Sequence, residues 1–412
     1  MQIPLLRRKS TRLLLDIILF LGLSLQGLHA QDLIPEPPVL NARSAVLYDL
    51  ATGTLLYEKN SREEIPPASL TKLMSLHLAY KAVDQGKLKL DQLIPIGPDA
   101  SFKNSPPQSS LMFLEEGQRV SLLDLMIGLA IPSGNDAGIA LARAVSGGLE
   151  FFVEEMNREA RRLGLNQTRF TDSFGYSEEN MTTAEDFARF CMIYLEQHPQ
   201  APAQLHSLTE YTYPREENMV PSGTSTHGSI TQYNRNSLVS RLDGVDGLKT
   251  GYIDESGYNL AVTAERRGRR LLAVLLGGTD IGPRDGSLVR TIDAAALLTY
   301  GFTAFTQFIP DLPRLPAARV WKAREKYVRL ETAPLPLMTL DRVRAAGIQW
   351  DIRLDRVIRA PFEKGTAAGT LTARDFRGEL LIQQPLVTQT GAPRGSWARR
   401  LLDSIRLFFL KG

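Results

Sequence analysis

The chain has 412 residues, which is more than a single hydrophobic core usually contains, so we expect two domains with appended segments. Hydrophobic residues make up 43% of the chain and charged residues 23%, a balance that excludes an intrinsically disordered protein. Lys and Arg exceed Asp and Glu by only 48 to 45, and this excess lies in terminal segments, which argues against nucleic acid as a partner.

Residues 1–30 have the features of a secretory signal. Four basic residues between Arg7 and Arg12 precede an apolar run at 17–25, and Ala30 offers a small residue for cleavage. The alternative is an uncleaved N-terminal anchor, but the apolar run is well under the ~20 residues that a membrane span needs. In both cases we expect the body of the protein to be exported.

The first folded elements are predicted to be a hairpin and a helix. Two β-rich runs, 44–50 and 54–58, surround Ala51-Thr52-Gly53, which indicates a hairpin turn. The helix is expected to begin near Ser69, because prolines end the preceding segment and apolar residues then recur at helical spacing.

Ser69 and Lys72 stand three residues apart at this helix start and therefore share one face. A desolvated lysine near other cations is neutral enough to accept the proton of a serine hydroxyl, which makes the serine a nucleophile. The helix N-terminus also favours an oxyanion. A Ser-x-x-Lys spacing nevertheless occurs about once by chance in a chain of this length, so by itself it is weak evidence.

A second group of polar residues lies at a break between two helical patterns, 121–130 and 137–145. Pro132 ends the first pattern, and Ser133 and Asn135 occupy the corner before the second. Taken alone, this segment is more simply explained as an ordinary turn with a capping side chain.

Two further helices are predicted at 151–163 and from a capping-box pattern at 182–185 through Leu195. The second includes Cys191, the only cysteine, which therefore cannot form an internal disulfide; we expect it to be a small buried hydrophobe.

Lys249, Thr250 and Gly251 precede a predicted hairpin at 258–276 and are expected on an edge strand, where the glycine lets another backbone come close. An exposed edge-strand lysine that prevents aggregation would be the commoner explanation. A helix is predicted from Asp285 to Tyr300, ending at Gly301.

The remainder is predicted to be a second, mainly β domain and a terminal helix. A proline-rich linker at 310–316 leads into short β-like runs between 319 and 386, where we find no nucleophile, metal cluster or phosphate loop in the sequence. We expect this domain to be a spacer or a protein-contact module.

The tail at 397–410 has the pattern of an interfacial helix. It is too short and too charged to cross ~30 Å of hydrocarbon. The alternative is a helix that docks on the protein's own surface. Its apolar residues fall within an arc of roughly 140° and its charged residues outside it; the apolar ones are Trp397, Leu401, Leu402, Ile405, Phe408 and Phe409.

Ser-x-x-Lys, Ser-x-Asn and Lys-Thr-Gly occur here in one order, and together they are a strong signal. On these motifs the chain resembles the serine D-alanyl-D-alanine carboxypeptidases, the low-molecular-mass penicillin-binding proteins. The resemblance runs from about residue 45 to 305 and includes PASLTKLM, SSLMFLEEGQRVSLLDLMIGLAIPSGNDA, GVDGLKTGY and SGYNL. It continues more weakly into the β domain, at Ala360-Pro361 and Lys364-Gly365, and into the tail.

This resemblance implies an α/β (α+β) catalytic domain like that of the β-lactamases and DD-peptidases, with an antiparallel sheet flanked by helices plus a helical subdomain. A small mainly β C-terminal domain and an amphipathic helix follow. The expected divisions are a signal peptide at 1–30, the catalytic domain at 31–309, the β domain at 310–392 and a membrane-anchoring helix at 393–412.

The resemblance also implies roles for individual residues. Ser69 attacks the carbonyl between the last two D-alanines, Lys72 takes its proton, and the backbone N–H groups of Ser69 and Tyr252 form the oxyanion hole. Ser133 passes a proton to the departing amine, and Asn135 holds the amide on the acyl side.

A cationic clamp for the terminal carboxylate is implied as well. It consists of Lys249, Thr250, Gly251 and, by its position six residues after Gly278, Arg284. Water then hydrolyses the acyl-enzyme with no metal and no cofactor, and the five histidines show no metal-ligand spacing.

The implied substrate is a peptidoglycan stem peptide that ends in D-Ala-D-Ala, and β-lactam antibiotics are implied as acylating agents. The implied location is the periplasmic face of the inner membrane, with the C-terminal helix on the membrane surface. One departure from the family pattern is Phe174, because members often carry histidine before the glycine that matches Gly175.

Three alternatives remain. A class A β-lactamase shares the three motifs but needs a Glu-x-x-Leu-Asn arrangement, which we do not find between Ser133 and Lys249. A non-catalytic cell-wall-binding protein would keep the fold without turnover. A D,D-endopeptidase, which cuts peptide cross-links, attacks the same kind of amide.

Overall fold

The computed structural model describes residues 35–218, 227–282, 284–355 and 357–409. It divides into two compact units, one from Glu36 to Thr303 and the other beginning at Ala304. The expected signal peptide at 1–30 lies outside the described residues.

The first unit is built on a five-stranded antiparallel sheet in the order β2-β1-β9-β8-β7, with β7 at one edge. Both predicted hairpins are present. The first strand, β1, pairs with the last strand of the sheet in sequence, β9, in the middle of the sheet. The strands are β1 (Ser44–Asp49), β2 (Thr54–Lys59), β7 (Val245–Ile253), β8 (Gly257–Arg266) and β9 (Arg269–Gly278).

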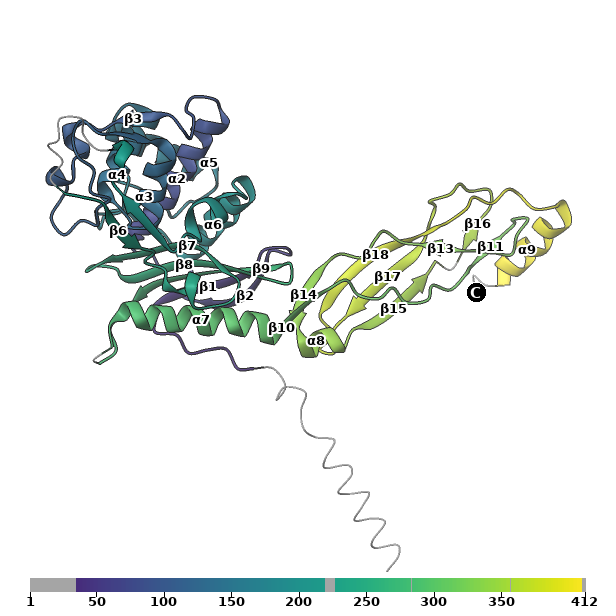
Figure 1. Ribbon diagram of the computed structural model, residues 1–412. Coiled ribbons are helices and arrows are strands. Elements are labelled where there is room, and N and C mark those ends of the chain that lie inside the picture. The colour runs from purple at the N-terminus through teal and green to yellow at the C-terminus, as the bar shows by residue number, and fades with distance from the viewer. Residues whose placement is uncertain (1–34, 219–226, 283, 356, 410–412) are drawn as a thin grey trace, which may run out of the picture. The chain divides into compact units, whose positions relative to one another are not determined.

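Helices cover both faces of this sheet: α7 lies along one face, and α2 and α6 lie over the other (Figure 1). Helices α2 to α5 pack on one another into the predicted helical subdomain. The helices are α2 (Lys72–Asp84), α3 (Leu122–Ala130), α4 (Asn135–Ser146), α5 (Leu149–Arg162), α6 (Ala184–Gln197) and α7 (Gly286–Ala304). Two small ribbons complete the unit, β3 (Leu93–Pro95) with β4 (Arg119–Ser121) and β5 (Glu210–Tyr213) with β6 (Ile230–Tyr233).

Side-chain caps fix where two of the helices begin. The hydroxyl of Ser121 accepts the N–H of Asp124 at the start of α3, and that of Thr183 accepts the N–H of Asp186 at the start of α6. Each cap satisfies a backbone donor that would otherwise have no helical partner.

The predicted end of the helix that starts near Asp285 was wrong, because α7 continues through Gly301 to Ala304. A Cβ at Gly301 would lie 2.7 Å from the side chains of both Leu47 and Leu271 on the sheet. The glycine therefore lets the helix approach the sheet closely, and tertiary packing outweighs its tendency to end helices.

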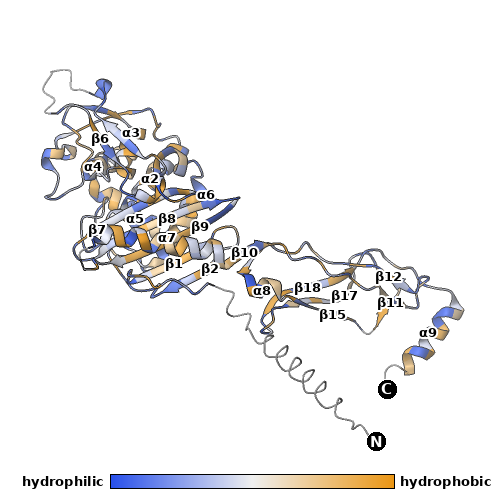
Figure 2. Cartoon of the chain, turned by 60° about the horizontal axis from the view of Figure 1, so that its bottom comes forward, coloured by the Kyte–Doolittle hydropathy of each residue, from blue (hydrophilic) through white to orange (hydrophobic). Residues whose placement is uncertain are grey.

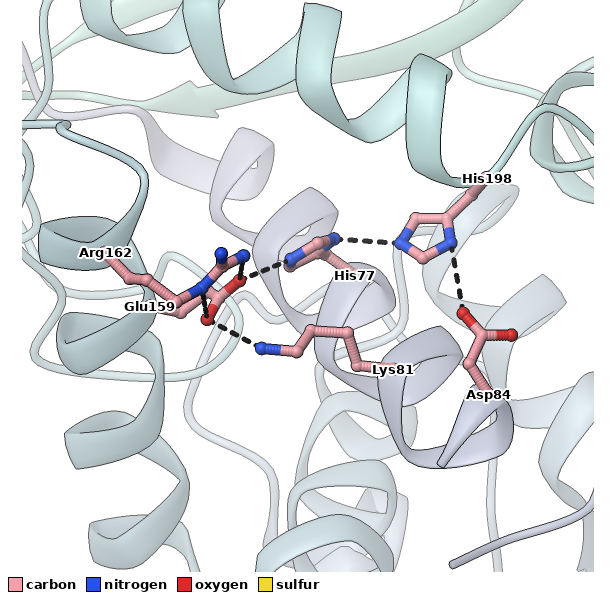
Figure 3. A network of polar contacts seen from close by, with 6 residues as sticks. All are labelled: His77, Lys81, Asp84, Glu159, Arg162 and His198. Carbon is pink, nitrogen blue, oxygen red and sulfur yellow. Dashed lines mark hydrogen bonds and ion pairs between the residues drawn. The ribbon is translucent and has the colours of Figure 1, made fainter. Parts of the chain in front are cut away.

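A buried polar network joins α2, α5 and the end of α6 (Figure 3). His77 on α2 contacts Glu159 on α5 through Nε2 (2.9 Å), and its Nδ1 lies 2.9 Å from Nε2 of His198, just after α6. The Glu159 carboxylate also accepts hydrogen bonds from Lys81 and Arg162. All three of His77, His198 and Glu159 are buried, so this network links α2 to its two neighbours.

Burial shifts the proton affinities of two histidines. It lowers the pKa of His198 to about 4, and the neighbouring His77 and Lys81 act in the same direction. Burial also lowers the pKa of His206, which bonds the Tyr194 hydroxyl, to about 3. The only carboxylate near the free Nδ1 of His198 in the described part of the chain is Asp84, at 3.9 Å.

We predict that acid destabilises the first unit through these histidines. The unfolded chain takes up protons near pH 6.5, whereas folded His198 does so only near pH 4, so the free energy of unfolding falls as the pH drops between these values. His198 alone accounts for up to about 3 kcal/mol. Hydrogen exchange of α2 peptides at pH 7.5 and 5 measures this.

The matched control is His227→Gln, which changes a histidine outside the network. In His198→Gln the free energy of unfolding should depend less on pH, and the contribution of His206 should remain. In His227→Gln it should depend on pH as strongly as in the unmodified protein. Equal slopes in both variants would contradict the assignment.

The second unit is mainly β, as predicted, with one four-stranded sheet in the order β13-β18-β17-β15 and smaller ribbons. Its apolar core includes Leu330, Ile358, Leu371 and Leu386. Its elements are β10 (Phe305–Phe308), β11 (Ala318–Trp321), β12 (Tyr327–Val328), β13 (Leu330–Glu331), β14 (Met338–Asp341), α8 (Arg342–Ala346), β15 (Gln349–Leu354), β16 (Ile358–Arg359), β17 (Ala367–Arg374), β18 (Leu380–Thr388) and α9 (Trp397–Phe409).

Helix α9 is attached to this unit by one side only. The buried Asp403 carboxylate accepts the N–H of Lys322 (2.7 Å), Arg399 donates to the carbonyl of Arg324 (2.9 Å), and Leu407 is buried. All six apolar residues of the predicted interfacial face are exposed, between 49% and 77%. Figure 2 shows hydrophobic and hydrophilic residues alternating along α9. Among the described residues no helix combines the length and apolar character that a membrane span needs.

Candidate active site

Ser69 lies in a 3-10 turn, η2 (Ala68–Thr71), that runs directly into α2, as the sequence predicted. Lys72 is the first residue of α2 and is completely buried. Its Nζ donates a hydrogen bond to Ser69 Oγ at 2.9 Å. The serine hydroxyl therefore has a lysine amine in direct contact.

Three oxygens surround the Lys72 amine. Besides Ser69 Oγ, Nζ donates to Asn135 Oδ1 at 2.8 Å and to the carbonyl of Phe174 at 2.6 Å. The three partners come from η2, from α4 and from the loop before α6, so the lysine joins three parts of the unit.

Burial lowers the pKa of Lys72 to about 7, while the negative charge of Asp172 acts against this shift and Arg235 acts with it. About half of the lysine is therefore neutral at pH 7, and the neutral amine is a proton acceptor of the strength that catalysis at neutral pH requires.

The second motif lies at the corner between α3 and α4. The buried Asp136 carboxylate accepts the N–H groups of Met112 and Leu114 and thereby fixes the segment that crosses this corner. Ser133 has φ +67° and is 2% exposed, and its Oγ has no hydrogen-bond partner among the described residues. The ordinary-turn alternative does not account for a buried hydroxyl held in a strained conformation.

The third motif lies on the edge strand β7, where Lys249 is 1% exposed, so it is not the exposed edge lysine of the alternative explanation. Burial lowers its pKa, and the charge of Lys72 adds to the effect. A Cβ on Gly251 would lie 2.7 Å from the Pro67 carbonyl and 3.2 Å from Ser69 N. The backbone of the strand therefore packs directly against the turn that contains Ser69.

Ser69 lies between two hollows of about 550 and 590 Å³, which share Gln108, Ser110 and Tyr252. The two hollows differ in the charge of their lining, so the groove is acidic on one side of Ser69 and basic on the other. The first is also lined by Glu178, Glu179, Asp254 and Glu255, and the second by Ser133, Thr250, Arg235, Arg241 and Arg290.

The structure places arginines other than Arg284, the one expected from the sequence, near Ser69. Arg284 is exposed and is not among the described residues that line either hollow, whereas Arg235 lines the basic one. Arg235 donates from Nε to the carbonyl of Pro132, at the Ser133 corner (3.0 Å). Buried Arg290 donates to the carbonyls of Gly251 and Asn259 and so supports β7.

The sequence around Arg235 does indicate that its loop is held in place. Asparagines flank it, and both anchor the loop: Asn234 donates to the carbonyls of His206 and Leu208, and Asn236 donates to that of Gly247. An arginine between two asparagines that fix a loop, shortly before Lys249, indicates a guanidinium group held in a defined position.

Residues 31–280 match the family model described as D-alanyl-D-alanine carboxypeptidase, which is more than half of the chain. The chain belongs to this family. The D-alanyl-D-alanine carboxypeptidase DacD of Escherichia coli K12 is 33% identical over 401 residues, which cover 95% of this chain and 98% of the relative.

Two solved structures extend the comparison. The carboxypeptidase DacD of Francisella tularensis has a TM-score of 0.72 and 25% identity, covering 90% of this chain and 98% of its own. Penicillin-binding protein D2 of Listeria monocytogenes, in a cefotaxime-bound form, has a TM-score of 0.55 and 27% identity, covering 65% of this chain and all of its own. The chain is therefore a serine-type D-alanyl-D-alanine carboxypeptidase of α+β fold, and the D,D-endopeptidase, β-lactamase and non-catalytic alternatives are not favoured.

We predict that Gly175→Ala disables this carboxypeptidase. Gly175 has φ +78°, and a Cβ there would lie 1.8 Å from the carbonyl oxygen of Ala68, so the nucleophile turn must move. A displacement of about 1 Å costs on the order of 100-fold in rate. The measurement is the rate of acylation by a fluorescent penicillin.

Gly147→Ala is the matched control, because Gly147 has φ +79° but no heavy atom lies within 4 Å of its Cβ position. It carries the same backbone strain without the collision. Equal losses in the two variants would show that contact with the nucleophile turn is not the cause.

Proposed function

We propose that Ser69 is the nucleophile and Lys72 its general base in the carboxypeptidase reaction. The observation that carries this proposal is the 2.9 Å contact between Ser69 Oγ and the buried Lys72 Nζ, whose pKa is about 7. Neutral Lys72 takes the hydroxyl proton as Ser69 attacks the carbonyl between the last two D-alanines of the stem peptide. The backbone N–H groups of Ser69 and Tyr252 stabilise the oxyanion.

Departure of the terminal D-alanine needs a proton and a grip on its carboxylate. Ser133, whose buried Oγ has no other partner in the described structure, relays the proton to the leaving amine. Lys249, Thr250 and Gly251 bind the carboxylate from β7, and we assign the accompanying guanidinium to Arg235 instead of Arg284, because Arg235 lines the groove.

Asn135 serves the acyl side of the substrate and also Lys72. Its Oδ1 accepts from Lys72, and its Nδ2 donates to Ser109 Oγ at 2.9 Å. Substrate binding at Asn135 therefore exchanges the Ser109 contact for an amide of the peptide. Water then hydrolyses the acyl-enzyme, with Lys72 again as the base.

We predict that Ser69→Ala abolishes covalent labelling by a fluorescent penicillin, because a β-lactam carbonyl is attacked by the same hydroxyl. The test uses the protein cut before Trp397, and the release of D-alanine from a pentapeptide ending in D-Ala-D-Ala should disappear in parallel. Labelling that persists in correctly folded Ser69→Ala would refute the nucleophile assignment.

Cross-link cleavage is the neighbouring activity to measure against, because both reactions attack a D-alanyl amide. The comparisons favour the carboxypeptidase, and the groove extends to both sides of Ser69. Mass spectrometry of products from cross-linked muropeptides and from pentapeptides, in one competition assay, measures the preference.

We further propose that the enzyme is exported and lies at the periplasmic face of the inner membrane, held by α9. The proposal is supported by the signal-like residues 1–30 and by the exposed apolar face of α9, whose opposite side is attached to the β unit through Asp403 and Leu407. An interfacial helix of this kind binds by apolar burial together with basic residues near the headgroups.

We predict that Ile405→Asp combined with Phe408→Asp shifts the full-length protein from the membrane to the soluble fraction. The two changes place charges in a face that would otherwise be buried among lipid chains. Leu337→Asp with Leu380→Asp, at 41% and 50% exposure elsewhere in the same unit, is the control and should leave partitioning unchanged. Unchanged partitioning of the α9 variant would mean that another element anchors the protein.

A further inference from the structure

One carboxylate organises the loop that leads from Asp172 to Asn180. Asp172 accepts four consecutive backbone N–H groups, from Phe174 (2.8 Å), Gly175 (2.5 Å), Tyr176 (3.1 Å) and Ser177 (2.7 Å). It also accepts a hydrogen bond from the side-chain amide of Asn180 at 2.8 Å. So many donors on one ionised group fix the path of the loop.

This loop contacts the start of α2 and the turn before it at three points. The Phe174 carbonyl accepts the Lys72 amine at 2.6 Å, the Ser173 carbonyl accepts the hydroxyl of Ser75 on α2, and Gly175 packs on the backbone of Ala68. The residue that holds Lys72 is thus directly followed by the residue that touches the Ser69 turn.

We propose that Asp172 is a positioning residue for Lys72: it fixes the Phe174 carbonyl against the amine and places a negative charge near it. The inference rests on the proposed role of Lys72 as general base. Asp172 does not itself touch the reacting atoms; it acts through the loop and through its field.

The charges around Lys72 make Asp172 the main counterweight to burial. Asp172 from the loop and Asp136 from α4 favour the charged amine, with Asp172 the stronger, and Arg235 disfavours it. Lys249 on β7 is a second buried amine close enough to interact with Lys72, and burial and the charge of Lys72 lower its pKa. The Phe174 ring, 5.9 Å from Nζ, adds a weak attraction for the charged form.

The combined effect is a lysine that titrates near neutral pH. Burial and the charge of Arg235 alone would lower the pKa of the amine further, and an amine of lower pKa is a weaker base in the transition state. The carboxylate restores enough basicity for proton abstraction while the loop keeps the amine within 2.9 Å of Ser69 Oγ.

The test is Asp172→Asn, which keeps the shape and one carbonyl acceptor but removes the charge. Acylation of the full-length enzyme by a fluorescent penicillin is measured from pH 5 to 10. We expect the acid limb of the rate profile to move to lower pH by about one unit, because loss of a nearby negative charge favours the neutral amine. A limb that stays in place would overturn the charge role.

Asp186→Asn is the matched control. Asp186 also caps a loop, accepting the N–H of Gln167 and the hydroxyl of Thr168, but it is not among the groups that act on Lys72. Its acid limb should coincide with that of the unmodified enzyme, and a shift as large as that of Asp172→Asn would overturn the proposal.

Asp172→Glu tests the positioning role, and it carries the test if Asp172→Asn does not fold. It keeps the charge but moves the oxygens by one methylene, so the acid limb should stay while the maximal rate falls by about 10- to 100-fold. An unchanged maximal rate would overturn positioning through the loop.

Failure of this inference is distinguishable from failure of the proposed function. If Ser69→Ala is still labelled, the nucleophile assignment is wrong. If Ser69→Ala is unlabelled and the profile of Asp172→Asn equals that of the unmodified enzyme, only the role of Asp172 is wrong.

Discussion

The removal of one lysine amine from water is the physical constraint on which the active site depends. A buried ammonium is unfavourable unless several acceptors surround it, and Lys72 has three, from three different segments of the chain. Because those acceptors include the hydroxyl of Ser69, the same contacts that make burial tolerable also hold the amine against that hydroxyl. The fold around Lys72 is therefore inseparable from its chemistry.

The sheet and the helices serve this arrangement by holding backbone against backbone. Edge strand β7 lies against the Ser69 turn at Gly251, and the loop before α6 lies against it at Gly175. Both contacts are too close for any side chain, so glycine is a requirement of geometry at these two positions. The helical corner at Ser133 supplies the third approach, fixed by the carboxylate of Asp136.

The sequence predicted the parts of this protein that depend on local patterns. The hairpins, the helix that starts beside Ser69, the mainly β second unit and the free apolar face of α9 follow from periodicity and turn residues. The family followed from three motifs in order. These features depend only on residues close together in the chain, or on motifs whose spacing is known.

What the sequence did not predict depends on partners far apart in the chain. Gly301 was expected to end a helix, but its sheet contacts with Leu47 and Leu271 outweigh its propensity. Arg235 was not singled out from the sequence, although it lines the basic hollow and the asparagines on either side of it donate to backbone carbonyls of other segments. The role of Asp172 was also invisible, since it depends on a loop packing on a turn about a hundred residues earlier.

The glycine contacts at the nucleophile turn also limit the direction from which the hydroxyl can be reached. Backbone closes the turn on the Gly175 side and on the Gly251 side, so a reactant must approach Ser69 along the groove that joins the acidic and basic hollows. In the proposed reactions the peptide and the β-lactam ring share this groove, so a change that narrows it acts on both of them.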